Sequence, residues 1–375
     1  MIHFPHADAL CALAQPYDPD SVPAGLFDRA MAQISLFHCH HTPGYEHWLN
    51  ANGLAVEDLE HLTDWSRLPP IYANYFKQRL LLSPTGENAL ELTSSGTSGQ
   101  KSRMRYDERS MAAAQGMVAR IFEHYGWFTP DSPCNYLLFS HEPEKVNHVG
   151  TAHTDQFLRS FAPANRIFHA LRRTGKGHEF DVFGAIRTLQ EFAEEGLPVR
   201  IFGFPALLCH ALERMRETAT PNLKLAPDSL VFLGGGWKKQ AAQEIPRHEV
   251  YEHITRQLGI EAHRCRDGYG AVEHAVPYIE CAHHRFHVPV YSKAFIRHPS
   301  NFSVQPFGEA GLLSFVSPYI SSSPAHAVVM SDLATLHPAN CECGLNTQWF
   351  ELHGRAGTSA SRSCAMAASE LIKEN

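Results

Sequence analysis

The sequence lacks a basic stripe, a long apolar run and an internal repeat. Its 32 Lys and Arg residues are outnumbered by 39 Asp and Glu residues, and charges of both signs are scattered along the chain. Proteins that bind nucleic acid or an anionic membrane surface concentrate positive charge on one face. We therefore expect no nucleic-acid partner for this chain, whose formal net charge is -7.

No uninterrupted apolar stretch approaches the roughly 20 residues that a membrane-spanning helix needs. The start of the chain, Met1 to His6, lacks the basic region and apolar core of a secretory signal. The nine cysteines are an odd number, widely spaced in a chain too large to need disulfide stapling. We expect reduced thiols, no membrane span and a cytoplasmic location.

The apolar content suits a globular protein, because 44% of the 375 residues are hydrophobic. Apolar residues recur at helical spacing between Met111 and Tyr125. Short apolar runs then alternate with helical patterns, which is typical of an α/β fold with largely parallel sheets. The expected strands are 136–139, 199–202 and 230–233, and the expected helices are 204–217 and 237–257.

From about residue 285 the pattern changes to short strands separated by turns, which indicates a β-rich subdomain. The expected strands there are 288–291, 311–316 and 327–330. We divide the chain into four parts: an N-terminal wrapping segment (1–90) with a helix near 72–77, an α/β core (91–284), the β-rich subdomain (285–357) and a C-terminal tail (358–375).

One loop carries the strongest local signal for chemistry, Leu92-Thr93-Ser94-Ser95-Gly96-Thr97-Ser98-Gly99-Gln100-Lys101-Ser102. Glycines let backbone N–H groups turn toward one point, hydroxyls add donors and Lys101 adds positive charge, which together suit a polyphosphate. The loop is not a Walker motif, because Gln100 separates Gly99 from Lys101. A Gly/Ser surface loop is the alternative, but the hydroxyl density beside a lysine favours phosphate binding.

This loop resembles the first core motif of the adenylate-forming superfamily, which includes acyl-CoA synthetases, peptide-synthetase adenylation domains and luciferases. Further motifs follow in the superfamily's order: Gly234-Gly235-Gly236 after a strand, Tyr269-Gly270 with Glu273, then Asp332, and finally Gly354-Arg355. Each alone has a structural alternative as a turn, a solvated charge or a helix cap. Their shared order favours the resemblance, which implies the superfamily's large domain of stacked, mostly parallel sheets.

The resemblance implies ATP and Mg²⁺ as cofactors and a role for each motif residue. The phosphates would be bound by Thr93, Ser94, Ser95, Gly96, Thr97, Ser98, Gly99 and Lys101, the adenine by Gly235, Gly236, Tyr269 and Gly270, the Mg²⁺ by Thr97 and Glu273, and the ribose by Asp332 and Arg355.

The chain is most similar to a narrower family, the acyl-protein synthetase of the bacterial bioluminescence fatty acid reductase complex. The similarity is carried by Gly234-Gly235-Gly236-Trp237-Lys238, by Val272-Glu273 with Glu280-Cys281, and by His287-Val288-Pro289-Val290. It implies a carboxylic acid substrate, a fatty acid by this similarity, and an acyl-accepting partner such as a reductase.

Cys364 lies where this family carries its acyl group as a thioester. Ser361 or Ser363 would cap the following helix, and the helix N-terminus with Arg362 would favour the thiolate of Cys364. An inert thiol in a frayed tail is the alternative.

The superfamily's mobile C-terminal lid, which supplies a catalytic lysine, is expected to be missing, because only a short tail follows Arg355. The acyl-protein synthetase family shares this truncation. We expect Lys101, Lys238 or Lys239, or a partner, to supply the positive charge instead.

A group of soft ligands is a candidate for structural zinc: Cys281 and a histidine of the segment ending at His287, with Cys341 and Cys343. Unliganded thiols are the alternative, because a Cys-x-Cys turn is weaker evidence than paired Cys-x-x-Cys knuckles.

Three functions stay open at this point. The first is acyl-adenylate formation followed by acylation of Cys364. The second is a lidless enzyme that adenylates an aromatic or other small acid in secondary metabolism. The third is a nucleotide-binding partner or scaffold without catalysis.

Overall fold

The computed structural model describes residues 3–84, 89–93, 102–142, 157–175, 177–235 and 244–356. Contacts between residues group the chain into two units. The first consists of Met1–His124, Gly270–Tyr278 and Arg285–Asn375, and the second of Tyr125–Tyr269 and Ile279–His284. The boundaries inferred above from the sequence remain predictions.

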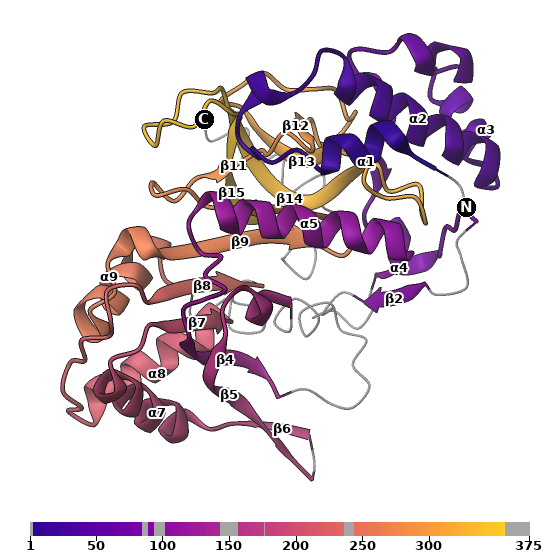
Figure 1. Ribbon diagram of the computed structural model, residues 1–375. Helices are drawn as coiled ribbons and strands as arrows, with labels where there is room; N and C mark the ends of the chain where they lie inside the picture. Colours follow the sequence, from indigo (N-terminus) through magenta and orange to yellow (C-terminus); the bar gives the residue numbers. More distant parts are fainter. Residues whose placement is uncertain are drawn as a thin grey trace. The chain divides into compact units, whose positions relative to one another are not determined.

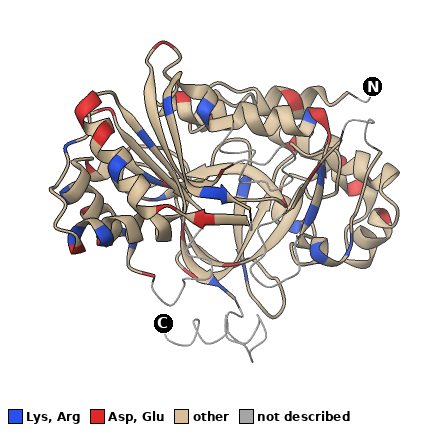
Figure 2. Cartoon of the chain, turned by 90° about the horizontal axis from the view of Figure 1, so that it is seen from below, with Lys and Arg blue, Asp and Glu red and all other residues tan. Residues whose placement is uncertain are grey.

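The distribution of charge and the hydropathy of the helices bear on the expected partners and on the expected absence of a membrane span. Figure 2 shows Lys and Arg interspersed with Asp and Glu along the described helices and strands. Among the described residues, no helix combines the length and hydropathy that a membrane crossing requires.

The first unit combines N-terminal helices with a mostly antiparallel sheet. Its helices are α1 (Pro5–Cys11), η1 (Pro19–Ser21), α2 (Leu26–His41), α3 (Tyr45–Ala51), η2 (Val56–His61), η3 (Trp65–Arg67), α4 (Tyr75–Gln78) and α5 (Glu108–His124). Its strands are β1 (Ile71–Tyr72), β2 (Leu90–Thr93), β3 (Arg103–Tyr106), β11 (Phe286–His287), β12 (Lys293–Arg297), β13 (Ala310–Val316), β14 (Ala327–His337) and β15 (Trp349–Arg355).

The main sheet of this unit has the strand order β11-β15-β14-β13-β12, and the short β1 pairs in parallel with β14 (Figure 1). The other neighbours along this path are antiparallel. Strands β2 and β3 form a separate antiparallel hairpin. β14 lies near the middle of the main sheet, and its apolar residues from Ala327 to Met330 are buried, as expected for a strand covered on both faces.

The second unit is an α/β layer structure. Its described elements are β4 (Cys134–His141), η4 (Arg159–Phe161), β5 (Ala164–Thr174), β6 (Gly177–Phe180), α7 (Val182–Glu195), β7 (Val199–Gly203), α8 (Pro205–Glu217), β8 (Leu230–Gly234), α9 (Arg247–Leu258) and η6 (Ala262–Arg264). Two further strands, β9 (Cys265–Ala271) and β10 (His274–Ile279), have residues in both units.

The seven-stranded sheet has the order β10-β9-β8-β7-β4-β5-β6. Strands β9, β8, β7, β4 and β5 run parallel, and β6 is an antiparallel edge strand. Figure 1 shows α7, α8 and α9 grouped beside these strands. Apolar residues of the helices, such as Leu189, Leu208 and Ile254, share one buried cluster with Leu137 and Val231 of the sheet. The α/β fold expected from the sequence is therefore confirmed.

Local chemistry sets the ends of these helices. The Asp181 carboxylate accepts a hydrogen bond from the Gly184 N–H at 2.8 Å and so caps the start of α7. Gly196 and Gly259 directly follow α7 and α9. Their φ angles of 69° and 71° are left-handed values that glycine adopts most readily, so they end the two helices. Pro205 begins α8, where its missing N–H costs nothing.

Most expected elements are present, and three of them differ. The helix expected near 72–77 begins only at Tyr75, because Tyr72 belongs to strand β1. The helix expected at 237–257 begins only at Arg247, after Pro246; residues 244–246 are not helical and 237–243 lie outside the described residues. The strand expected at 288–291 is wrong, because strand pairing is confined to Phe286–His287 and the chain turns after Pro289. Strand β3 was not expected between the Gly/Ser loop and α5.

The close packing of β4 against β7 predicts a strong effect of one glycine. Gly203 has a φ of 126°, and a Cβ there would lie 2.4 Å from the Phe139 carbonyl oxygen. We expect Gly203→Ala to destabilise the protein by at least about 3 kcal/mol, because strain adds to a backbone clash. Gly196→Ala is the matched control, since its φ is 69° with no atom within 4 Å, and should cost about 1–2 kcal/mol. Equal shifts in the thermal unfolding midpoint would contradict this ranking.

Two buried histidines face each other in the first unit. The rings of His38 and His326 stack with centroids 4.8 Å apart. His38 Nδ1 lies 2.7 Å from Ser83 Oγ and Nε2 lies 3.1 Å from the Ile320 carbonyl. Tyr45 OH lies 3.0 Å from His326 Nε2. Burial lowers the pKa of His38 to about 3 and that of His326 well below its ordinary value.

This burial predicts a loss of stability in acid. The unfolded chain protonates each histidine below pH about 6.5, whereas the folded protein keeps His38 neutral down to pH about 3. Histidine protonation therefore does not lower the free energy of unfolding above pH about 6.5. As the pH falls toward 3, that free energy declines by up to about 1.4 kcal/mol per pH unit for each such histidine. Denaturant unfolding at pH 7.5 and 5.5 should show a smaller decline in His38→Gln than in wild type. His40→Gln, at an exposed position of the same helix, should keep the wild-type decline, and identical slopes in both variants would refute the assignment.

Candidate active site

The β2–β3 hairpin brackets the loop that the sequence predicts to bind phosphate. The two strands pair from Leu90 with Tyr106 to Thr93 with Arg103. Paired strands hold both ends of the intervening segment close together. Thr93 is therefore at the last paired position before the loop.

Several predicted site residues lie outside the described part of the chain. They are Ser94, Ser95, Gly96, Thr97, Ser98, Gly99, Lys101, Gly236, Lys238 and Cys364.

Glu273 is a buried acid on the turn between β9 and β10, with 6% of its surface exposed. Burial raises the pKa of Glu273, and three neighbours oppose that rise: the polar hydroxyl of Ser102 and the positive charges of Lys77 and Arg355. A carboxylate withdrawn from water is stabilised by a cation bound next to it. The position thus fits the magnesium ligand predicted from the sequence.

Two tyrosines hold the turn that carries Glu273. The hydroxyl of Tyr106, on β3, donates to the Val272 carbonyl at 2.6 Å. The Ala275 N–H donates to the Tyr319 hydroxyl at 2.8 Å. The two hydroxyl oxygens lie 3.0 Å apart. Both sides of the turn are therefore fixed, and Glu273 is linked to the hairpin that brackets the loop predicted to bind phosphate.

The segment that follows Tyr319 is fixed to the start of α5. Asp107 accepts a hydrogen bond from the Ser110 N–H at 2.7 Å and from the Ser321 hydroxyl at 2.8 Å. The Ser321 N–H donates to the Ser110 hydroxyl at 2.9 Å, and Arg109 donates to the Tyr319 carbonyl at 2.9 Å. One acid thus caps a helix and holds the buried segment that positions Tyr319. Sequence reasoning missed Tyr106, Tyr319 and Lys77, and it included Ser102 only as the last residue of the loop motif.

Asp332 and Arg355 are brought together by the pairing of β14 with β15. Their Cα positions are direct partners in the antiparallel ladder. The Arg355 Nε lies 3.4 Å from an Asp332 carboxylate oxygen. The Asp332 side chain is 16% exposed and that of Arg355 is 66% exposed. A fixed acceptor beside an accessible donor suits recognition of neighbouring hydroxyl groups, such as those of a ribose.

In the second unit, two of the predicted adenine-binding residues, Gly235 and Tyr269, lie at the carboxyl ends of two adjacent parallel strands. Gly234 of β8 pairs with Gly268 of β9, and Gly235 follows with a φ of 79°. Tyr269 is half-buried. In open α/β sheets, ligands bind outside the carboxyl ends of the strands. Gly235 and Tyr269 thus occupy the edge where such a ligand is expected.

Glu280 supports the strand that carries Tyr269. Its side chain is fully buried and accepts hydrogen bonds from the Tyr251 hydroxyl and from the Asp267 N–H, both at 2.8 Å. The Arg247 guanidinium also donates to it. Burial, together with the charge of Glu280, raises the pKa of Asp267 to about 7, against the lowering effect of Arg247. This network fixes β9 two residues before Tyr269.

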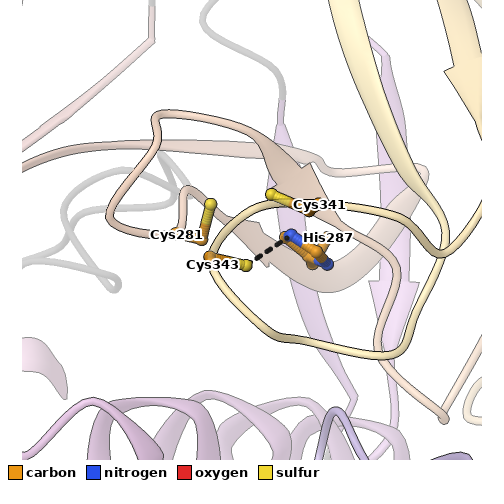
Figure 3. Close-up of side chains that lie close together, drawn as sticks. All are labelled: Cys281, His287, Cys341 and Cys343. Atoms are coloured by element: carbon orange, nitrogen blue, oxygen red, sulfur yellow. Dashed lines mark hydrogen bonds between the residues drawn. The ribbon is translucent and has the colours of Figure 1, made fainter.

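The four predicted zinc ligands, Cys281, His287, Cys341 and Cys343, also come together. One ligand atom from each lies within 4.8 Å of the ligand atoms of the other three, and Figure 3 shows the sulfur atoms and the imidazole facing a common point. The four residues predicted to bind zinc thus form one local group within the described part of the chain.

Comparison with known proteins identifies the family. The model of the family described as acyl-protein synthetase, LuxE, matches residues 23–373. The long-chain-fatty-acid–luciferin-component ligase of Vibrio harveyi is 23% identical over 342 residues, which covers 90% of this chain and 85% of that protein. The ligase of the same name from Aliivibrio fischeri is 22% identical over 354 residues, covering 93% and 89%.

Solved structures show the same fold at low sequence identity. The chain is similar to an open conformation of 2-hydroxyisobutyryl-CoA ligase, with a TM-score of 0.65, 13% identity and coverage of 92% of this chain and 77% of that one. The post-adenylation state of the ligase gives a TM-score of 0.64, 14% identity and coverage of 91% and 69%. With the match along residues 23–373, these findings show that the chain belongs to the acyl-protein synthetase family of acid-activating ligases, built on the adenylate-forming fold.

Proposed function

We propose that this chain activates a fatty acid with ATP and transfers the acyl group to its own Cys364. The observation that carries the proposal is the family match over residues 23–373, which includes Cys364. The curated relatives, named for a long-chain fatty acid, support the class of acid. An acyl-accepting partner such as a reductase would then receive the acyl group.

The reaction has two steps. An oxygen of the substrate carboxylate attacks the α-phosphorus of ATP, so that an acyl-adenylate forms and pyrophosphate leaves. The Cys364 thiolate then attacks the acyl carbonyl carbon, a thioester forms and AMP leaves. The first step needs charge neutralisation and positioning more than covalent help.

Glu273 would hold Mg²⁺ together with Thr97. Its burial and the hydrogen bonds that fix its turn support this role, because a carboxylate fixed in position binds a hard cation without reorganising. Bound Mg²⁺ would neutralise charge on the phosphates. Lys101 and Lys238 would add positive charge near the leaving pyrophosphate.

The remaining motif residues would bind the nucleoside. Asp332 would accept hydrogen bonds from the ribose hydroxyls, and Arg355 would donate to the ribose or the phosphate. Their direct pairing on β14 and β15 supports this role. Gly235, Gly236, Tyr269 and Gly270 would frame the adenine, because glycine lets a base approach the backbone closely.

The role of Glu273 predicts a large loss of activity on neutralising it. We expect Glu273→Gln to reduce acid-dependent ATP–pyrophosphate exchange about 10²- to 10³-fold, the usual effect of removing one main electrostatic contact to the transition state. Exchange would be measured over a range of Mg²⁺ concentrations. Glu309→Gln, at an exposed position of the first unit, is the control and should retain full activity. A folded Glu273→Gln protein with the wild-type rate and Mg²⁺ dependence would exclude this role.

The whole proposal is tested by intact mass after incubation with ATP, Mg²⁺ and a panel of fatty, aromatic and small acids. We expect a fatty acyl increment on wild type, removed by hydroxylamine and absent from Cys364→Ala. Cys209→Ala, which removes a half-buried thiol on α8, should still be acylated.

Other outcomes distinguish the remaining functions. Pyrophosphate release without an adduct would reject self-acylation and favour an enzyme that hands its adenylate to a partner. Acylation by an aromatic or small acid alone would replace the fatty acid as substrate. No pyrophosphate release with any acid would reject acid activation.

A further inference from the structure

We propose that Cys281, His287, Cys341 and Cys343 bind one structural zinc ion, independently of the proposed acid activation. The observation that carries this is geometric: the four ligand atoms lie within 4.8 Å of one another (Figure 3). Three cysteine sulfurs and one imidazole are one of the usual four-coordinate ligand sets of structural zinc.

The ligands come from three places in the chain. Cys281 is on the turn that leads from β10 into β11, His287 is the last residue of β11, and Cys341 and Cys343 lie on the loop that joins β14 to β15. Strand β11 pairs with β15, with His287 opposite Trp349. The strand pairing therefore brings ligands that are distant in sequence to the same end of the sheet.

His287 is oriented as a metal ligand. Its Nδ1 lies 2.9 Å from the Thr347 hydroxyl, and its Nε2 lies 3.3 Å from the Cys343 sulfur. A zinc-bound histidine commonly has its second ring nitrogen in a hydrogen bond that fixes the ring and its tautomer. Thr347 would serve this purpose, which leaves Nε2 to face the metal.

The cysteines lie on tight turns that suit metal binding. Gly344 has a φ of 84°, and its N–H donates to the Cys341 carbonyl at 3.1 Å, which closes the turn around Cys343. In the other turn, the His283 N–H donates to the Cys281 sulfur at 3.4 Å and the His284 N–H donates to the Cys281 carbonyl at 3.0 Å. Backbone N–H groups directed at sulfur stabilise the thiolate that binds zinc.

The distances fit a four-coordinate site. With a Zn–S distance of about 2.3 Å, sulfur atoms at tetrahedral corners lie about 3.8 Å apart, so the 4.8 Å group closes onto an ion with small side-chain movements. Cys281, His287 and Cys341 are buried and Cys343 is half-buried. Binding would release the thiol protons as the thiolates form.

A site with four protein ligands has no open position for a substrate, which identifies the zinc as structural. The ligands lie at the loop end of the β14–β15 hairpin, whereas Asp332 is five residues along β14 from His337, a distance of about 17 Å. The ion would fix the hairpin at the end opposite Asp332 and Arg355.

The first test is the metal content of the full-length protein, purified under reducing conditions without added metal. We expect one equivalent of zinc per chain by plasma mass spectrometry. Cys341→Ser and Cys343→Ser should each lower that content at least about tenfold, whereas Cys209→Ser should leave it unchanged. Chelation of the zinc should lower the thermal unfolding midpoint, and zinc should restore it.

A second measurement keeps the proposal testable where a variant does not fold. Cobalt exchanged into the wild-type protein should give the charge-transfer absorption of thiolate ligands and the visible bands of a tetrahedral site. The proposal is overturned if the reduced protein binds neither zinc nor cobalt, if both serine variants keep full zinc content, or if peptide mapping finds a disulfide among Cys281, Cys341 and Cys343. ATP–pyrophosphate exchange by the same preparations reports on acid activation separately.

Discussion

The hydrogen bonds of Tyr106 and Tyr319 connect the parts of the first unit on which its candidate chemistry depends. Tyr106 bonds to Val272, 166 residues away, and meets Tyr319, 213 residues away. Tyr106 belongs to the strand after the loop predicted to bind phosphate, Val272 to the turn that carries Glu273, and Tyr319 to the segment held by Asp107. Without these contacts the buried carboxylate of Glu273 would have no fixed position, because a two-residue turn alone does not hold a charged side chain out of water.

Several ionisable groups are buried in this protein, and the cost of burying a charge is offset or avoided differently in each. Glu280 is compensated fully by Arg247, Tyr251 and a backbone N–H, so it fixes the strand. His38 and His326 are kept neutral by burial. Burial disfavours the charged form of Glu273, and its neighbours offset that effect only in part, so its pKa stays raised. This incomplete compensation separates a site suited to an incoming cation from groups that serve the fold.

The β14–β15 hairpin combines two proposed roles at opposite ends. At one end its loop supplies two sulfur ligands to the Cys/His cluster; at the other, Asp332 and Arg355 are paired across the strands. Between them, His337 stacks on Trp349 with ring centroids 3.8 Å apart, and Arg285 lies over Trp349 at 4.0 Å. A hairpin fixed at both ends keeps its register, because a slip of one residue would turn every side chain to the opposite face.

The sequence alone determined features that depend on neighbouring residues. It predicted the α/β fold, the strands β4, β7, β8 and β13, and the helices α5 and α8, because periodicity is a local property. It also named the four Cys and His residues as candidate ligands, but their convergence depends on the pairing of β11 with β15. The order of the superfamily's motifs singled out Asp332 and Arg355 in the sequence. Only the tertiary structure showed that these two residues are direct partners across β14 and β15. It also decided that Tyr106, Tyr319 and Ser102 support Glu273, that β11 ends before Pro289, and that α9 starts at Arg247. These facts depend on pairing and burial between residues far apart in the chain, and no local pattern in a single sequence records such contacts.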